Sequence, residues 1–295
     1  MKRSFKFNAY RLFLPVLVLL LSACAVQKKT GVKEGINLVY KSSLGSSFTV
    51  NSQMKSSVIT EQMGESMEVE VSSASQSVYR TLAVHNNGTM KMEKEMKSGE
   101  QVTKSPMGDT STDFTGWIGK KVEFQLQPVG TVSEITGLDQ FKPIVSATGE
   151  TLSTDYVERS IRNEFIKLPE HPVKAGETWS LQDTMEIPIG GGALQQEESI
   201  TFTVGEKVTL DGLDCIRITA EGTSKMYGEM EQQGMTLEIT RQTKTTGVLY
   251  FALEKGFFHS MEYTSNAVGE VFIPVASMSI PQKLTTKLSL STVFD

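Results

Sequence analysis

Apolar and polar residues alternate along most of the chain beyond residue 36. The alternation is clearest in 66–73 (SMEVEVSS), 120–127 (KKVEFQLQ) and 199–209 (SITFTVGEKVT). A period of two is that of a strand with one buried face, and the Val, Ile, Thr and aromatic residues of these runs favour strands. Turn sequences such as Asn86-Asn87-Gly88 separate consecutive runs, which favours antiparallel hairpins. The pattern predicts a mainly β protein of curved antiparallel sheets with a few short helices.

Two segments have helical spacing instead. Residues 138–147 are predicted to form a short helix. In residues 154–166, Val157, Ile161 and Phe165 fall on one helical face, and a proline follows the end of the segment. We assign 151–169 to a connecting helix, which acts as a hinge or lid or packs on a sheet to cover it.

A glycine-rich run occupies residues 189–198. It lacks the Lys-Ser/Thr pair that a phosphate-binding loop requires. We therefore predict a flexible hairpin loop at this point of the chain.

Parts of the sequence recur later in the chain. Residues 45–54 and 176–185 share the pattern Gly-x-x-aromatic-x-aliphatic-x-x-x-Met, which aligns Phe48 with Trp179. Two further pairs of segments follow in the same order and at nearly equal offsets: 82–92 with 216–226, which aligns Gly88 with Gly222, and 122–126 with 249–253. We interpret the matches as an internal duplication of one β unit, at 36–150 and 170–295. Chance similarity among strands is the alternative.

The N-terminal residues have the composition of a secretory signal. Four basic residues lie among the first eleven positions, and the apolar run 12–21 follows them. A basic region, an apolar stretch of about ten residues and a small-residue cleavage site describe a signal peptide. The run is too short to span a bilayer, which takes about 20 residues. We predict a signal peptide at 1–23.

The end of this region, Leu21-Ser22-Ala23-Cys24, resembles the lipobox of bacterial lipoproteins. The resemblance implies cleavage before Cys24, lipid attachment to its thiol and a lipidated tether at 24–35. Acyl chains anchor a protein with about 0.8 kcal/mol for each buried methylene, and stable anchoring takes more than one chain. By the same resemblance, Ala25 implies sorting to the outer membrane. We therefore expect an envelope protein that is lipid-anchored in the outer membrane and faces the periplasm.

The cysteine content and the charge bear on two further properties, disulfide formation and nucleic-acid binding. With Cys24 lipidated, Cys215 is the remaining thiol, so no intramolecular disulfide can form. The formal net charge is −5, and removal of the basic signal peptide makes the chain more acidic still. An acidic chain disfavours nucleic acid, whose binding requires cationic patches that neutralise phosphates.

Catalytic motifs are sparse. His85, His171 and His259 stand far apart without metal-ligand spacing, and there is no Gly-x-Ser-x-Gly or dinucleotide-binding motif. The triplet Asp109-Thr110-Ser111 is similar to the Asp-Thr-Gly of aspartic proteases, but the third residue differs and no second triplet completes a carboxylate pair. We expect a protein that is not an enzyme and binds no metal or cofactor.

Methionine is abundant, with 14 residues. Met is flexible and polarisable, and it is common on surfaces that accept varied apolar partners. We predict that the concave side of the curved sheets forms a slot for an acyl chain or another apolar ligand, lined by Phe48, Met54, Met92, Trp179, Met185 and Met226. The alternative is that methionine fills the cores of the sheets.

A lipobox followed by a duplicated, strand-rich acidic region resembles a broad group of periplasmic lipoproteins of Gram-negative bacteria. More remotely, a curved antiparallel sheet with covering helices resembles the LolA-like lipoprotein carriers. These resemblances imply a membrane-anchored periplasmic protein that binds an apolar ligand such as lipid, or serves as a scaffold, without catalysis. A docking subunit of a cell-envelope assembly is the first alternative, and a hydrolase is the second.

Replacing Cys24 by Ser is expected to abolish membrane anchoring, because serine offers no thiol for lipid attachment. Phase partitioning of membranes in detergent measures the effect: the wild type enters the detergent phase and the variant stays in the aqueous phase. A Cys24→Ser variant that still enters the detergent phase refutes lipidation at this residue.

Overall fold

The computed structural model describes residues 35–62, 64–146, 151–189, 191–232 and 234–295. Cys24, the predicted signal peptide and most of the predicted tether lie outside these residues. Among the described residues, no helix has the length and apolar character needed to cross a bilayer.

The elements of the N-terminal half are mostly strands. They are β1 (Ser47–Gln62), β2 (Glu65–Val84), β3 (Met90–Lys104), β4 (Thr110–Thr112), β5 (Lys121–Leu126), β6 (Val132–Thr136), the 3-10 turn η1 (Leu138–Gln140), β7 (Ile144–Val145), β8 (Thr151–Leu152) and helix α1 (Thr154–Arg162).

The C-terminal half consists of longer strands. They are β9 (Thr178–Ile189), β10 (Gly192–Leu210), β11 (Leu213–Gln232), β12 (Met235–Ala252), β13 (Phe257–Ile273), the 3-10 turn η2 (Pro274–Ala276) and β14 (Met278–Phe294).

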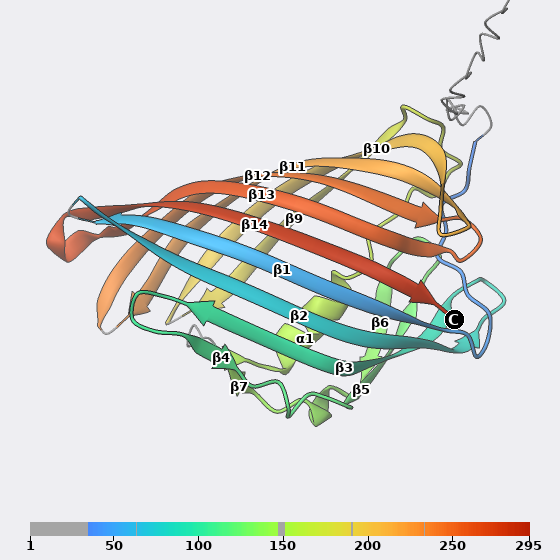
Figure 1. The fold of residues 1–295 in the computed structure, drawn as a ribbon, viewed down its shortest axis with the longest axis horizontal. Coiled ribbons are helices and arrows are strands. Elements are labelled where there is room, and N and C mark those ends of the chain that lie inside the picture. Colours follow the sequence, from blue (N-terminus) through green and yellow to red (C-terminus); the bar gives the residue numbers. More distant parts are fainter. Residues whose placement is uncertain (1–34, 63, 147–150, 190, 233) are drawn as a thin grey trace, which may run out of the picture.

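One antiparallel sheet contains nearly all of these strands. Its order is β6-β5-β3-β2-β1-β14-β13-β12-β11-β10-β9, with β4 beside β3, while β7 and β8 form a separate pair. Neighbours in the sheet are mostly neighbours in sequence, except that β14 returns to pair with β1. The sheet curls along its width, and α1 lies on its concave side (Figure 1). The prediction of a mainly β protein with curved antiparallel sheet is confirmed.

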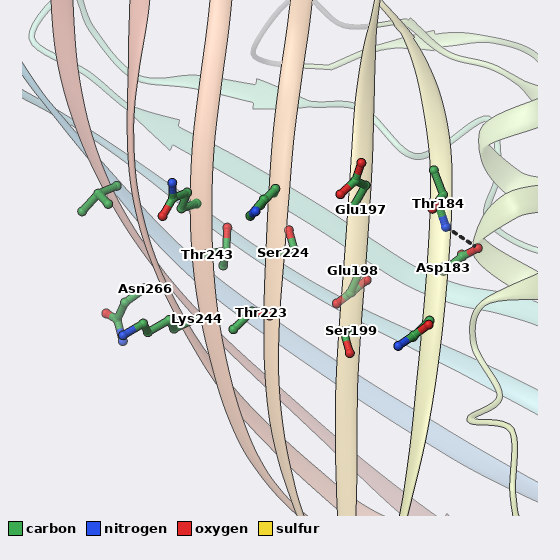
Figure 2. A pocket seen from close by; sticks show the side chains of 14 residues that line it. Asp183, Thr184, Glu197, Glu198, Ser199, Thr223, Ser224, Thr243, Lys244 and Asn266 are labelled. Atoms are coloured by element: carbon green, nitrogen blue, oxygen red, sulfur yellow. Dashed lines mark hydrogen bonds between the residues drawn. The ribbon is translucent and has the colours of Figure 1, made fainter.

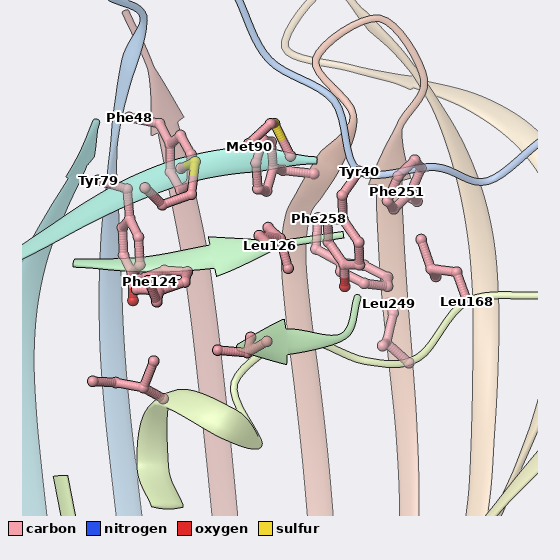
Figure 3. Packing of buried hydrophobic residues seen from close by; sticks show 14 of the residues in the cluster. Tyr40, Phe48, Tyr79, Met90, Phe124, Leu126, Leu168, Leu249, Phe251 and Phe258 are labelled. Carbon is pink, nitrogen blue, oxygen red and sulfur yellow. The ribbon is translucent and has the colours of Figure 1, made fainter. Parts of the chain in front are cut away.

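The hydrophobic core gathers at one end of the curved sheet, where β1 begins and β2 ends. Strand residues of the concave face alternate into it, for example Val122, Phe124 and Leu126 of β5. Figure 3 shows the core, in which aromatic rings of distant strands meet. Phe48 stacks on Tyr79 at 5.0 Å between ring centroids, and it also contacts Phe257 at 4.5 Å. Burial of such side chains is the main favourable term in folding.

The segment before β1 closes the core from the side. Tyr40 is 2% exposed and makes edge-on contacts with Phe165 and Phe251, at 5.6 and 6.0 Å between ring centroids. Its hydroxyl donates to the carbonyl oxygen of Ile166 at 3.1 Å. The chain that follows α1 is therefore fixed to the concave side of the sheet by both packing and a hydrogen bond.

The predicted helices are shorter than expected. Of the described residues 138–146, only Leu138–Gln140 form a helical turn, and Ile144–Val145 belong to β7. Helix α1 ends at Arg162, so Phe165 lies beyond the helix, although its ring packs against Tyr40 in the core. Burial of Phe165 reflects this tertiary contact rather than a continued helical face.

The glycine-rich run also differs from its prediction. It does form a hairpin between β9 and β10, but residues from Gly192 onward are already in β10, paired with β9. The loop is therefore much shorter than 189–198. Backbone pairing across the hairpin outweighs the low strand preference of glycine.

The internal duplication is not confirmed. Phe48 and Trp179 are each the second residue of a long strand, β1 and β9. Gly88, however, lies in the turn between β2 and β3 with φ of 81°, whereas Gly222 lies within β11 and pairs with Ile200 and Thr245. The alignment of Gly88 with Gly222 is wrong, because one position needs a turn and the other a continuous strand. Both predicted units contribute strands to the same sheet.

Cys215 of β11 is a free, fully buried cysteine. Burial, with further contributions from Asp214 and Asp211, raises the pKa of its thiol to about 11. The side chain therefore stays a protonated thiol at neutral pH and packs as a small apolar group.

Replacing Gly247 by Ala is expected to destabilise the fold by about 1–3 kcal/mol, the usual cost of overpacking. A Cβ atom at this position of β12 would lie 2.5 Å from Cδ1 of Tyr263, whose ring lies across the glycine. The matched control is Gly116→Ala, where nothing lies within 4 Å of the added atom. Urea denaturation measures both free energies of unfolding. Equal values for the two variants would contradict the packing of Tyr263 on Gly247.

Candidate functional site

A cavity of about 310 Å³ lies between the concave face of the sheet and the segments that cover it. Strands β1, β2, β3 and β14 form its floor. The turn 114–120, the residues around Phe141, and helix α1 form its roof. The cavity adjoins the hydrophobic core and continues it along the strands.

The walls of the cavity are mainly apolar. Trp117 is central in the roof: its ring contacts Phe114, Phe141 and Tyr156 at 5.8 to 6.4 Å between centroids. Its indole N–H donates to the carbonyl oxygen of Lys142 at 2.7 Å, which fixes the ring in place. Further apolar lining comes from α1 and the strands, namely Val157, Ile161, Met54, Met96, Val122 and Leu288.

The floor of the cavity is made of small hydroxyl side chains. Ser73, Ser75 and Ser77 alternate onto the concave face of β2, and Ser52 of β1 is the register partner of Ser75. In the core, the equivalent concave positions carry large residues such as Tyr79. Because serine leaves space that a large residue would fill, this run of small side chains opens the cavity next to a closely packed core.

A partly exposed ion pair lies at the end of the cavity nearest the core. The Lys94 ammonium of β3 donates to both carboxylate oxygens of Glu164, at 3.0 and 2.9 Å. The Tyr79 hydroxyl donates to the same carboxylate, and the ammonium lies 5.4 Å from the centre of the tyrosine ring. Burial, and then Glu164, raise the pKa of Tyr79 well above its ordinary value, so the phenol stays protonated and remains a donor.

A smaller cavity of about 60 Å³ lies on the core side of this polar group. Phe48, Val50, Tyr79, Leu290 and Phe165 are among the residues that line it. Val50 and Leu290 occupy the concave face of β1 and β14 next to Ser52 and Leu288 of the larger cavity. The two cavities therefore follow one another along the same strands.

A third hollow is an open groove of about 810 Å³ across β9 to β13 (Figure 2). Most of its lining side chains are polar and exposed. Many of them, for example Thr223, Lys244 and Asn266, lie on the convex face of the sheet. Asp183 and Glu198 are register partners at one end of it. Burial, and then Asp183, raise the pKa of Glu198. Apart from Val268, the side chains that line the groove are polar, and no aromatic side chain or methionine is among them.

The sequence-predicted ligand-lining residues are not brought together in one slot. Met54 lines the cavity under α1, and Phe48 lines the smaller one beside it. Met92 is fully buried in the core. Trp179 and Met185 lie on edge strand β9, where the tryptophan stacks on Phe202, and Met226 lines a separate groove of about 510 Å³.

The histidines lie outside the cavity. His171 contacts Glu177 at 2.9 Å, and His259 contacts Asp211 at 3.0 Å. Within the part of the chain that the structure describes, no group of three or more His, Cys, Asp or Glu side chains could hold a metal ion.

Sequence reasoning missed Lys94, Trp117 and Glu164 as site residues. The signal that could have revealed the floor is "SSASQS" (72–77), where a strand with alternating pattern carries small residues on both faces. No local sequence pattern identifies the residues of the roof. Trp117 and Ile161 are far apart in sequence, and only the folded path of the chain between β4 and β9 brings them to the cavity.

The fold is a curved antiparallel sheet with an apolar cavity between its concave face and helix α1. The chain belongs to the family of unknown function DUF6263, whose pattern matches residues 75–258. That range contains α1, the roof of the cavity and strand β3 of its floor, whereas β1 and β14 lie outside it. None of the curated proteins compared with the sequence matches it.

Two solved structures are similar to this chain at low identity. One is an exported protein with a YmcC-like fold from Bacteroides fragilis NCTC 9343, with 9% identity, a TM-score of 0.23, and coverage of 84% of this chain and 97% of that chain. The other is an outer membrane channel from Pseudomonas putida F1, with 8% identity, a TM-score of 0.24, and coverage of 86% and 98%. At such TM-scores we draw neither fold nor function from them.

Replacing Glu198 by Gln is expected to stabilise the protein at neutral pH, by less than about 1 kcal/mol because solvent screens the half-buried group. The folded protein favours the protonated carboxyl, so its stability falls as pH rises from the ordinary glutamate pKa, near 4, through the raised pKa. The gain in Glu198→Gln should therefore vanish below about pH 4. Urea denaturation against pH measures it, with Glu221→Gln on an exposed position as control. A gain that does not depend on pH would contradict this assignment.

Proposed function

We propose that this protein is a non-enzymatic binding protein of the bacterial cell envelope that holds a small apolar ligand, such as an acyl chain, under helix α1. The observation that supports this function is the cavity of about 310 Å³ between α1 and the concave face of the sheet. Ligand pockets are typically apolar hollows of about 300–1,000 Å³ with a few polar groups, and this cavity has both properties.

The side chains of the cavity suit a flexible apolar ligand. Met54 and Met96 lie on opposite sides of the serine floor, and methionine adapts its shape to varied partners. Trp117 is held by its hydrogen bond and presents a rigid aromatic surface. Such walls favour chains and rings without demanding one particular shape.

The concave face offers a path for a longer chain beyond the cavity. Val58 of β1 is the register partner of Val69 on one side and Leu284 on the other. All three side chains are half-buried on the same face as Met54. An extended apolar chain that starts under α1 could follow these residues along the strands. The opposite, convex face carries exposed charged residues such as Lys55 and Lys287.

The envelope location in this proposal rests on the N-terminal sequence. The resemblance of Leu21-Ser22-Ala23-Cys24 to a lipobox supports a lipid anchor in the outer membrane with the sheet in the periplasm. In that position the cavity would lie close to a source of acyl chains.

Edge strand β9 favours a second candidate function, docking to another envelope protein. Within the described strands β9 pairs only with β10, and an open strand edge can add a strand from a partner. Trp179 and Met185 lie on this strand.

Replacing Ser73 by Phe is expected to weaken ligand binding at least tenfold, because the ring would occupy the cavity. The matched control is Ser72→Phe, at the neighbouring exposed position on the convex face of the same strand. The measurement is the fluorescence increase of the neutral apolar probe N-phenyl-1-naphthylamine on titration with the soluble chain from residue 25.

Binding to the wild type and to Ser72→Phe, but not to Ser73→Phe, supports the cavity as the site. If the wild type gives no fluorescence increase, or if Ser73→Phe binds as tightly as the wild type, the proposed function is wrong. Co-purification with a partner that Trp179→Asp releases would favour docking through β9.

A further inference from the structure

We infer that the ligand of the cavity is an amphiphile whose head group is an anion, a carboxylate or a phosphate, bound by Lys94 and Lys120. This inference rests on the proposed function, since it names the chemical class of the ligand that the cavity under α1 would hold. It depends on the charged side chains of the cavity rather than on its apolar walls.

Lys94 places a cation at the boundary between apolar cavity and core. Its ammonium has three N–H donors, and two of them meet the carboxylate oxygens of Glu164. The third has no hydrogen-bond partner among the described residues. The side chain is 21% exposed, so an incoming anion can reach it without opening the core. Charge-assisted hydrogen bonds of this kind are stronger than neutral ones.

Lys120 supplies a second cation at the same part of the cavity. It is half-buried and lines the cavity, and within the described residues its ammonium has neither an ion pair nor a hydrogen bond. The next residue, Lys121, is the register partner of Glu95, the chain neighbour of Lys94. Lys120 therefore comes just before β5, two residues from Val122, the register partner of Lys94, and both lysines line the cavity. Glu100, the acidic residue that lines the cavity, is exposed and lies farther along β3 than Lys94.

These positions place the two lysines at the end of the cavity nearest the core. Lys94 is the register partner of Tyr79, beside the core. Met54 and then Val58 lie progressively farther along β1 in the opposite direction. A ligand with its anionic head at Lys94 and Lys120 would extend its chain along Met54 toward Val58. A neutral apolar ligand would leave the unpaired donors of both lysines without a partner.

Glu164 competes with such a head group, because its carboxylate already occupies two donors of Lys94. Removing the charge of Glu164 should free the ammonium and strengthen anion binding, whereas removing the charge of either lysine should weaken it. A purely structural ion pair predicts no change in ligand affinity for Glu164→Gln. The opposite signs of these effects distinguish head-group recognition from a general loss of stability.

The test compares decanoate with 1-decanol, which have the same chain and differ in head-group charge. Each competes with N-phenyl-1-naphthylamine for the soluble chain, below the micelle concentration. We expect decanoate to bind about tenfold more tightly than decanol, as one charge-assisted hydrogen bond implies. Lys94→Met and Lys120→Met should each weaken decanoate binding severalfold, Glu164→Gln should strengthen it severalfold, and decanol affinity should be unchanged throughout.

Lys91→Met is the control, since Lys91 lies on the convex face of the same strand and pairs with the exposed Glu123. Circular dichroism checks that each variant folds. If Lys94→Met does not fold, Lys120→Met and Glu164→Gln still test the inference. Equal affinities for decanoate and decanol, or lysine variants that bind decanoate as the wild type does, overturn the inference and leave the proposed function intact. Failure of both compounds to displace a bound probe, or of the probe to bind, overturns the proposed function itself.

Discussion

The antiparallel pairing of β1 with β14 holds the two ends of the folded chain together, and the candidate site depends on it. Met54 and Leu288, which both line the cavity, are register partners across this pair. Without the pairing, the strands of the N-terminal and C-terminal halves would not share one concave face. Bringing residues so far apart in sequence together costs loop-closure entropy, which burial of the shared core must offset.

The concave face changes character along its length. Near the beginning of β1 and the end of β2 it is filled by large aromatic residues, whereas toward the beginning of β2 it carries serines and then half-buried valines. The change in side-chain size along one continuous strand, rather than a separate domain, produces the cavity. The ion pair of Lys94 with Glu164, joined by the Tyr79 hydroxyl, marks the boundary. Both side chains of the pair are partly exposed, and ion pairs that solvent screens contribute little to stability.

Most strands could be predicted from the sequence, because their buried and exposed residues alternate regardless of which strand lies beside them. The runs 66–73, 120–127 and 199–209 all lie largely or wholly in strands. The helix predicted for 154–166 is present but ends at Arg162. Phe165 continued the apolar spacing for a different reason, its contact with Tyr40. The matched segments 82–92 and 216–226 were misleading for a similar reason, since a turn and a strand can share a short pattern of apolar residues and glycine.

Local patterning thus established the class of this protein, because alternation and turn residues act over a few neighbouring positions. Assembly of the cavity followed from long-range register instead. Ser73, Lys94, Trp117, Ile161 and Leu288 come from five separate segments, and no short stretch of sequence shows that they meet. Their convergence depends on which strands pair and on where α1 packs, and both are set by burial of the core as a whole. For that reason the predicted slot residues were dispersed in the fold, with Met54 at the cavity under α1 and Met92 in the core.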